Sequence, residues 1–278
     1  MKAWLALPVA LLLPAAAPGA PLELFNDRPF VTVMVNGHAT NALLDSAAET
    51  TLIDDDFAAR IGLIAAGQVT AHGSGADAMT ATLANPSTAR IRFGRWTYSG
   101  QPAILDLDEV SSRLIGRHVD MILGREIFDA NVVRLDLQRR TVDVGGRAGR
   151  RGVRLPLGEH RGTPTVPVAI EGHEAVQTVF DTGNGTGVLV GSAYARRIGL
   201  TGARIVAQEA GGGLGGAVRR DIVVLRSLTL AGRTFRNVRA AIDPGATASD
   251  LNIGTSILRH FLITTDFPNH AIWLEPHR

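Results

Sequence analysis

The chain contains one sequence pattern twice, and this internal repeat constrains its fold more than any other feature. In the first copy, a stretch of alternating apolar residues turns at Asn36-Gly37 and returns through an apolar run to Asp45. In the second copy, a similar stretch turns at Glu171-Gly172 and returns to Asp181. Alternation around such a turn is typical of a β-hairpin. The repeat therefore predicts two similar lobes, each with a hairpin that ends on an aspartate.

The two copies continue to correspond beyond the aspartates. Each has a segment ending in Ile-Gly-Leu, and each has a later element ending in an apolar residue and Gly before a last apolar strand. The separation is nearly constant for the pairs Asp45 and Asp181, Gly62 and Gly199, and Gly124 and Gly254. The 31 glycines fall largely between short apolar runs, as in strands joined by tight turns. We expect an all-β fold of two pseudosymmetric lobes, with short helices at residues 54–61 and 191–198 and brief turns after Gly124 and Gly254.

The composition is that of a globular chain. Hydrophobic residues make up 45% and charged residues 19% of the sequence, which excludes a disordered protein. There is no Cys, so disulfides, thiol nucleophiles and Cys-based metal sites are excluded. The arginines between residues 147 and 154 favour a solvated linker over an anion-binding patch, because no aromatic platform or helical stripe accompanies them. We expect no nucleic-acid partner.

The first residues have the features of an export signal. Lys2 gives a positive start, an apolar run follows, and small residues precede Pro21. The apolar run is interrupted by Pro8 and Pro14 and is shorter than the roughly 20 residues that a membrane span needs. An uncleaved anchor or a disordered tail is the alternative. We expect no stable membrane insertion after cleavage and a periplasmic or secreted protein. The predicted parts are a signal peptide at 1–20, an N-terminal lobe at 21–147 and a C-terminal lobe at 148–278.

Asp45 and Asp181 occupy equivalent positions, each where an apolar strand meets a turn of small residues. A carboxylate at the end of a buried strand is costly unless it has partners or a task. Two such groups at pseudosymmetric positions are expected to face each other and to share a proton. The ionised one can accept a proton from water while the other donates a hydrogen bond to a carbonyl, without metal or cofactor. The hydroxyls of Ser46 and Thr182 are expected to bind across the lobe interface, and Gly183 to allow close backbone approach.

The residues around both aspartates resemble the retropepsin-like and pepsin-like aspartic peptidases, in the bacterial branch of that clan. The second copy has the apolar-apolar-Asp-Thr-Gly form at residues 179–183. The run from Asp45 to Thr51 resembles the retropepsin stretch Asp-Thr-Gly-Ala-Asp-Asp-Thr. The two apolar-Gly elements and a Gly-rich segment in each copy complete the resemblance, which covers nearly all of the chain after the export segment.

The resemblance implies a bilobal acid-protease fold made of two retropepsin-like lobes in one chain. It implies an aspartic endopeptidase in which Asp45 and Asp181 activate a water against an extended peptide or protein substrate, with no cofactor and no metal. Residues that would support the loops or contact substrate are Ser46, Ala47, Glu49, Thr182 and Gly183. Flaps over the substrate are implied at Gly73-Ser74-Gly75 and within Gly211 to Gly216, including Gly212 and Gly213. Because one chain supplies both aspartates, we expect a monomer.

Ala47 departs from the family pattern, which has Gly at this position. A methyl group there would intrude on the substrate backbone, or would strain the loop if the position requires a positive φ. The main alternative is therefore a catalytically impaired peptide-binding protein with the same fold. A serine hydrolase is not indicated, because no Gly-x-Ser-x-Gly elbow occurs between a strand and a helix. The run Asp54-Asp55-Asp56 is interpreted as a helix N-terminal cap rather than a cation site.

Overall fold

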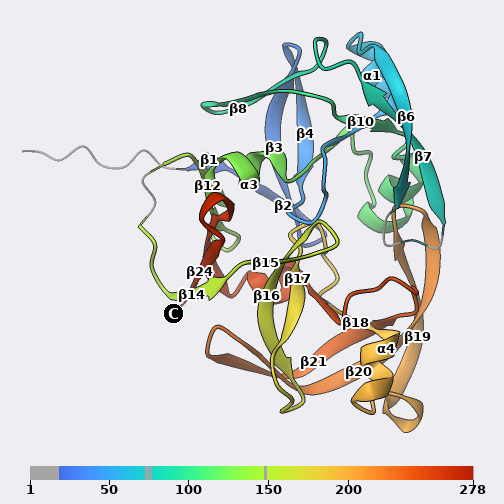
Figure 1. Cartoon of the computed structure of the whole chain (residues 1–278), viewed down its shortest axis with the longest axis vertical. Helices are drawn as coiled ribbons and strands as arrows, with labels where there is room; N and C mark the ends of the chain where they lie inside the picture. The colour runs from blue at the N-terminus through green and yellow to red at the C-terminus, as the bar shows by residue number, and fades with distance from the viewer. Residues whose placement is uncertain (1–18, 73–74, 76, 147–148, 278) are drawn as a thin grey trace, which may run out of the picture.

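The computed structural model describes residues 19–72, 75, 77–146 and 149–277 (Figure 1). The predicted export segment at 1–20 lies outside the described residues except for Gly19 and Ala20, and Ala20 pairs with Val142. Gly73 and Ser74 of the first predicted flap also lie outside them. Within the described part of the chain, no helix is long and apolar enough to cross a membrane.

The first lobe is built on a mixed sheet whose strands lie in the order β6-β7-β10-β5-β11-β4-β3-β8-β9, with β2 paired to β3 (Figure 1). Its strands are β2 Glu23–Phe25, β3 Arg28–Val35, β4 His38–Leu44, β5 Leu52–Asp54, β6 Ala65–His72, β7 Ala78–Ala84, β8 Arg90–Phe93, β9 Trp96–Ser99, β10 Ala103–Leu105 and β11 Met121–Leu123.

The second lobe has a sheet in the order β15-β16-β17-β22-β18-β21-β20-β19, and β16 also pairs with β20. Its strands are β15 Gly158–His160, β16 Thr163–Ile170, β17 Val176–Phe180, β18 Val188–Gly191, β19 Ile205–Gly213, β20 Gly216–Leu230, β21 Arg233–Asp243 and β22 Leu251–Ile253.

The two lobe sheets share the same strand pairings. In the first lobe β11 runs parallel to β4, with Leu123 opposite Leu44, and antiparallel to β5. In the second lobe β22 runs parallel to β17, with Ile253 opposite Phe180, and antiparallel to β18. Strand β5 also lies parallel to β10, as β18 does to β21. The predicted all-β fold of two pseudosymmetric lobes is confirmed.

A third sheet joins the two halves of the chain, in the order β1-β13-β12-β23-β24-β14. Its strands are β1 Ala20–Pro21, β12 Val132–Asp136, β13 Thr141–Val144, β14 Val153–Pro156, β23 Phe261–Asp266 and β24 Ala271–Pro276. The last strands of the two repeats meet where β12 pairs with β23, and Leu135 lies opposite Ile263. Both side chains are fully buried, so this sheet contributes to the core that the lobes share.

The core follows the alternation seen in the sequence. In the two equivalent hairpin strands β3 and β16, every second side chain is buried, because successive residues of a strand point to opposite faces. These side chains are Val31, Val33, Val35, Val166, Val168 and Ile170. They belong to one continuous apolar cluster with Phe180 and Leu44, the residues that precede the two aspartates. Each aspartate therefore directly follows a side chain that is anchored in the core.

Helical segments are short. They are α1 Asp55–Arg60, α2 Asp108–Val110, the π-helical turn η1 Ser111–Ile115, α3 Glu126–Ala130, α4 Ser192–Arg197, η2 Gly202–Arg204, α5 Thr255–Leu258 and η3 Phe267–Asn269. The predictions for α1 and α4 are confirmed, and the side chain of Asp54 caps α1 by accepting from Phe57 N at 3.2 Å. The helical segment at 108–115 was not predicted, although Leu107, Val110 and Leu114 have helical spacing.

Candidate active site

Asp45 and Asp181 directly follow the buried strands β4 and β17, and each loop is tied to the strand beside it. The backbone N–H of Asp45 donates to Leu123 O at 3.0 Å, and that of Asp181 donates to Ile253 O at 3.1 Å. The glycines that follow β11 and β22 allow other backbone segments to pack closely behind the two loops. A side chain at Gly124 would overlap the backbone of Thr50, and one at Gly254 would overlap Asn184. Each apolar-Gly element thus fixes the backbone of its aspartate loop.

Ser46 and Thr182 join the two aspartate loops through a reciprocal set of buried hydrogen bonds. The Ser46 hydroxyl donates to Phe180 O at 2.8 Å and accepts from Thr182 N at 3.1 Å. The Thr182 hydroxyl donates to Leu44 O at 2.8 Å and accepts from Ser46 N at 2.9 Å. Both side chains are fully buried, so these bonds are shielded from water. The residues next to the two aspartates therefore hold the two loops face to face.

The Asp45 carboxylate is held by its own loop. Its Oδ1 accepts from the backbone N–H of Ala47 at 2.8 Å and of Ala48 at 3.1 Å. Burial is the main cause that raises the pKa of Asp45 to about 7, and the adjacent charge of Asp181 and a hydrogen bond between the two side chains act in the same direction. The two backbone amides only partly oppose this rise. Asp45 is thus suited to keep a proton up to about neutral pH.

Asp181 has an additional donor. Its Oδ1 accepts from Asn184 N at 2.9 Å, as Asp45 accepts from Ala48, and its Oδ2 accepts from the side-chain amide of Asn252 at 2.7 Å. Burial raises the pKa of Asp181, and the hydrogen bond from Asn252 is the strongest influence that opposes this rise. The two acids therefore lie in different environments although their loops are equivalent.

A buried arginine adds positive charge beside the pair. Arg28, at the start of β3, is 7% exposed and donates from Nη1 to Asn26 O at 3.2 Å. It packs against the second loop, since a side chain at Gly185 would overlap its Cγ and Nη1. Burial lowers the pKa of Arg28, whereas the nearby charges of Asp181 and, next in strength, Asp45 raise it. Its charge in turn lowers the pKa of Asp181.

Gly183 is required by the approach of the opposite acid. A Cβ at Gly183 would lie 2.9 Å from Asp45 Oδ1 and closer still to its Oδ2 and Cγ. Ala47 occupies the equivalent place in the first loop, and neither Ala47 nor Gly183 has a positive φ. Strain in the Ala47 loop is expected only if the position requires a positive φ, and this condition is not met. The effect of its methyl group on substrate stays a prediction.

The two Gly-rich segments form hairpin tips that meet, as Figure 1 shows along one side of the molecule. The tip between β6 and β7 donates from Gly75 N to Leu214 O at 2.9 Å and from Asp77 N to Gly215 O at 2.8 Å. A side chain at Gly75 would overlap the backbone of Gly215, so the approach needs glycine. Gly212 has a φ of +123°, which also favours glycine.

Arg113 of η1 connects the first lobe to the second hairpin. Its guanidinium donates to Gly211 O and to Gly213 O, each at 2.9 Å, and pairs with Glu109 one turn earlier. A charged donor bound to two carbonyls is stronger than a neutral one. Arg113 thus holds the β19–β20 hairpin in its present position.

Glu49, predicted to contact substrate, is exposed and its side chain lies close to Gly162, before β16 of the other lobe. Sequence reasoning missed Asn252, Arg28 and Arg113. Asn252 had a recognisable signal, because it is the polar residue in the otherwise apolar element Leu251–Gly254, where the first copy has Ile122.

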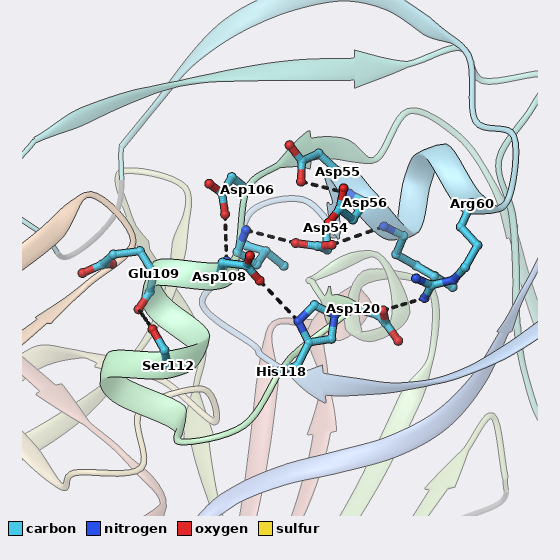
Figure 2. Close-up of polar contacts among 12 residues, drawn as sticks. Asp54, Asp55, Asp56, Arg60, Asp106, Asp108, Glu109, Ser112, His118 and Asp120 are labelled. Carbon is cyan, nitrogen blue, oxygen red and sulfur yellow. Dashed lines mark hydrogen bonds and ion pairs between the residues drawn. The ribbon is translucent and has the colours of Figure 1, made fainter.

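A second polar cluster lies at the start of α1 (Figure 2). Carboxylates of Asp54, Asp55 and Asp106 lie within 4.8 Å of one another. Backbone amides account for them: Asp54 accepts from Phe57 N and Leu107 N, and Asp55 and Asp106 accept from residues 56 and 108. Nearby, Asp120 pairs with Arg60 and His118 (Figure 2). These contacts are those of helix caps and a surface ion-pair network, as the sequence predicts for Asp54.

Comparison with protein families matches both copies of the repeated loop. The family model described as aspartyl protease matches residues 31–127 and 166–257, which include both aspartates and together make up more than half of the chain. The chain belongs to the aspartyl protease family. Among solved structures, it is similar to a retropepsin-like aspartic protease from Rickettsia conorii at 16% identity and a TM-score of 0.36, covering 44% of this chain and 89% of that one. No curated protein matches the chain.

Proposed function

We propose that this aspartyl protease family member is an endopeptidase in which Asp45 and Asp181 together activate one water molecule. The observation that carries the proposal is the reciprocal hydrogen bonding of Ser46 and Thr182, which holds the two loops so that a pair of carboxyl groups interact. A pair that shares one proton can act as base and acid in the same step.

The proposed reaction begins with the carboxylate of the pair accepting a proton from water as the water oxygen attacks the peptide carbonyl carbon. The protonated acid gives its proton to the carbonyl oxygen, which forms a neutral gem-diol. The C–N bond then breaks. The acid that took the proton of water donates it to the leaving nitrogen. The other acid, now ionised, takes a hydroxyl proton of the gem-diol as the carbonyl re-forms. The products are a carboxylic acid and an amine, and the pair returns to its starting state.

The substrate we propose is an extended peptide or unfolded protein segment. The two hairpin tips, which contact each other through backbone groups at Gly75 and Leu214, support this proposal, because Gly-rich hairpins can close over a chain and offer it backbone hydrogen bonds. We further propose a periplasmic or secreted monomer that hydrolyses its substrate without cofactor.

The test is incubation of the protein with denatured protein substrates between acidic and neutral pH, with and without pepstatin. Asp45→Asn and Asp181→Asn serve as variants that keep the side-chain size and remove the acid. We expect cleavage that pepstatin inhibits and that either substitution lowers by several orders of magnitude. Cleavage that survives both substitutions would exclude the aspartate pair. Binding of peptides without cleavage at any pH would instead support an impaired peptide-binding protein.

A further inference from the structure

The two lobes differ at one strand position beside the aspartates. Ile122 of β11 lies opposite Leu43, and Asn252 of β22 lies opposite Val179, so the two residues are equivalent. Ile122 is buried and packs in an apolar cluster of the first lobe. Asn252 is half-buried and donates to Asp181 Oδ2 at 2.7 Å. An isoleucine has no donor, so the first lobe cannot make this contact with Asp45.

The orientation of the Asn252 amide is fixed by a neighbour. Asn184 Nδ2 donates to Asn252 Oδ1 at 2.8 Å and to Gly187 O at 3.0 Å. Because the oxygen of Asn252 accepts this bond, its NH₂ group faces Asp181. An amide NH₂ can only donate, so it prefers a carboxylate to a protonated acid whose hydroxyl would point at it.

The charged groups that face Asp181 act in the same sense. Arg28, packed against the second loop at Gly185, favours a negative charge on Asp181. Asp45, at the end of β4, disfavours a second negative charge on the pair. These charges favour one negative charge on the pair. Within the described part of the chain, the amide side chain of Asn252 donates to Asp181, whereas the backbone amides of Ala47 and Ala48 donate to Asp45.

We propose that Asn252 is a positioning residue that makes Asp181 the ionised member of the pair and leaves the shared proton on Asp45. Asp181 is then the base that accepts the proton of water, and Asp45 is the acid that protonates the substrate carbonyl. The catalytic roles rest on the proposed peptidase function. The location of the proton is a property of the folded protein and is tested separately.

Substitution Asn252→Leu removes the donor and keeps the side-chain shape. The active form has one proton on the pair, so activity is lost on the acid side when Asp181 is protonated and on the alkaline side when Asp45 is deprotonated. Without its donor the Asp181 carboxylate is less stable, so the acid limb of the pH profile of kcat/KM moves to higher pH by about one unit. At pH values below the limb, kcat/KM is then about tenfold lower than in the wild type. The alkaline limb stays in place, because Asp181 is ionised on both sides of it.

The matched control is Ile122→Leu, which changes packing at the equivalent strand position and leaves both limbs where they are in the wild type. Asn252→Ala, which also lacks the donor, gives a second variant if the leucine variant fails to fold. We expect it to move the acid limb in the same direction, because an alanine side chain cannot donate to Asp181. An alkaline limb that moves instead of the acid limb would overturn the proposal, since Asp45 would then be the ionised acid.

Titration of the carboxyl carbons by ¹³C NMR separates this proposal from the peptidase function. Asp45→Asn and Asp181→Asn assign the two signals, and the first deprotonation of the pair should appear mainly at Asp181 in the wild type. In Asn252→Leu this first step should move to higher pH by about one unit. Titration curves identical in wild type and variant would refute the role of Asn252. If the first titration step moves in Asn252→Leu as expected but the wild type cleaves no peptide, the peptidase function alone is refuted.

Discussion

Replacing Gly183 with Ala tests how closely the two loops must approach. A Cβ at this position would lie 2.9 Å from Asp45 Oδ1 and closer still to Oδ2 and Cγ, whereas ordinary contacts of this kind begin at 3.4 Å. Either Asp45 or the Gly183 loop must therefore move by about 1 Å, a displacement that can lower the rate about 100-fold in a positioned active site. Because the loops are also joined by buried hydrogen bonds, we expect overpacking to lower the free energy of unfolding by about 1–3 kcal/mol.

The assay is kcat/KM on a cleaved peptide together with chemical denaturation. Gly67→Ala is the matched control, because a Cβ at Gly67 meets nothing within 4 Å and the residue has no positive φ. It should keep the wild-type rate and stability, which shows that the loss is not a general effect of replacing glycine. If Gly183→Ala had the rate and the stability of the wild type, Asp45 would not occupy the position described, and the face-to-face arrangement would be refuted.

Two further predictions concern the pKa of Asp45 and the contacts of Arg113. The raised pKa of Asp45, about 7 in the folded protein, means that the native state binds more protons than the unfolded chain between about pH 4 and 7. Stability should therefore fall as pH rises through this window, by at most about 4 kcal/mol for Asp45. Asp45→Asn should reduce that slope in denaturation experiments, and the raised pKa of Asp181 should leave a smaller slope of the same sign. Replacing Arg113 with Ala removes the charged donor to two carbonyls of the β19–β20 hairpin, so amide exchange in this hairpin should accelerate about tenfold and KM should rise with little change in kcat. Unchanged exchange would show that Arg113 does not hold the hairpin.

Much of the fold was predictable because its signals are local. A strand in which every second residue is apolar, followed by a turn with Gly in its second position, can be identified within a dozen residues. Both hairpins that carry the aspartates follow this pattern. The repeat then adds information that one copy lacks. Asp45 alone would be a polar residue at a strand end, but Asp181 at the equivalent position indicates that the two are related by the symmetry of the lobes.

The contacts that distinguish the two aspartates could not be predicted in the same way. Asn252 reaches Asp181 only because β22 pairs in parallel with β17, a register set by packing between segments far apart in the chain. Arg28 belongs to the first lobe and acts on an acid of the second, so its role appears only after the lobes dock. The proposed flap contact from Arg113 depends on a helical turn that the sequence prediction omitted.

Duplication and divergence have opposite roles in this protein. The features that both lobes retain, namely the strand registers, the hydroxyls of Ser46 and Thr182 and the glycines at 124 and 254, all hold backbone, because the two loops meet only if both have the same shape. One feature that differs lies at the carboxyl groups, where Asn252 of the second lobe corresponds to Ile122 of the first. A strictly symmetric pair would give its proton no preferred position, whereas hydrolysis needs a base on one acid and a proton on the other at the same moment. One chain that carries both copies can place Asn252 in one lobe and Ile122 in the other, an asymmetry that two identical subunits cannot build from their own sequence.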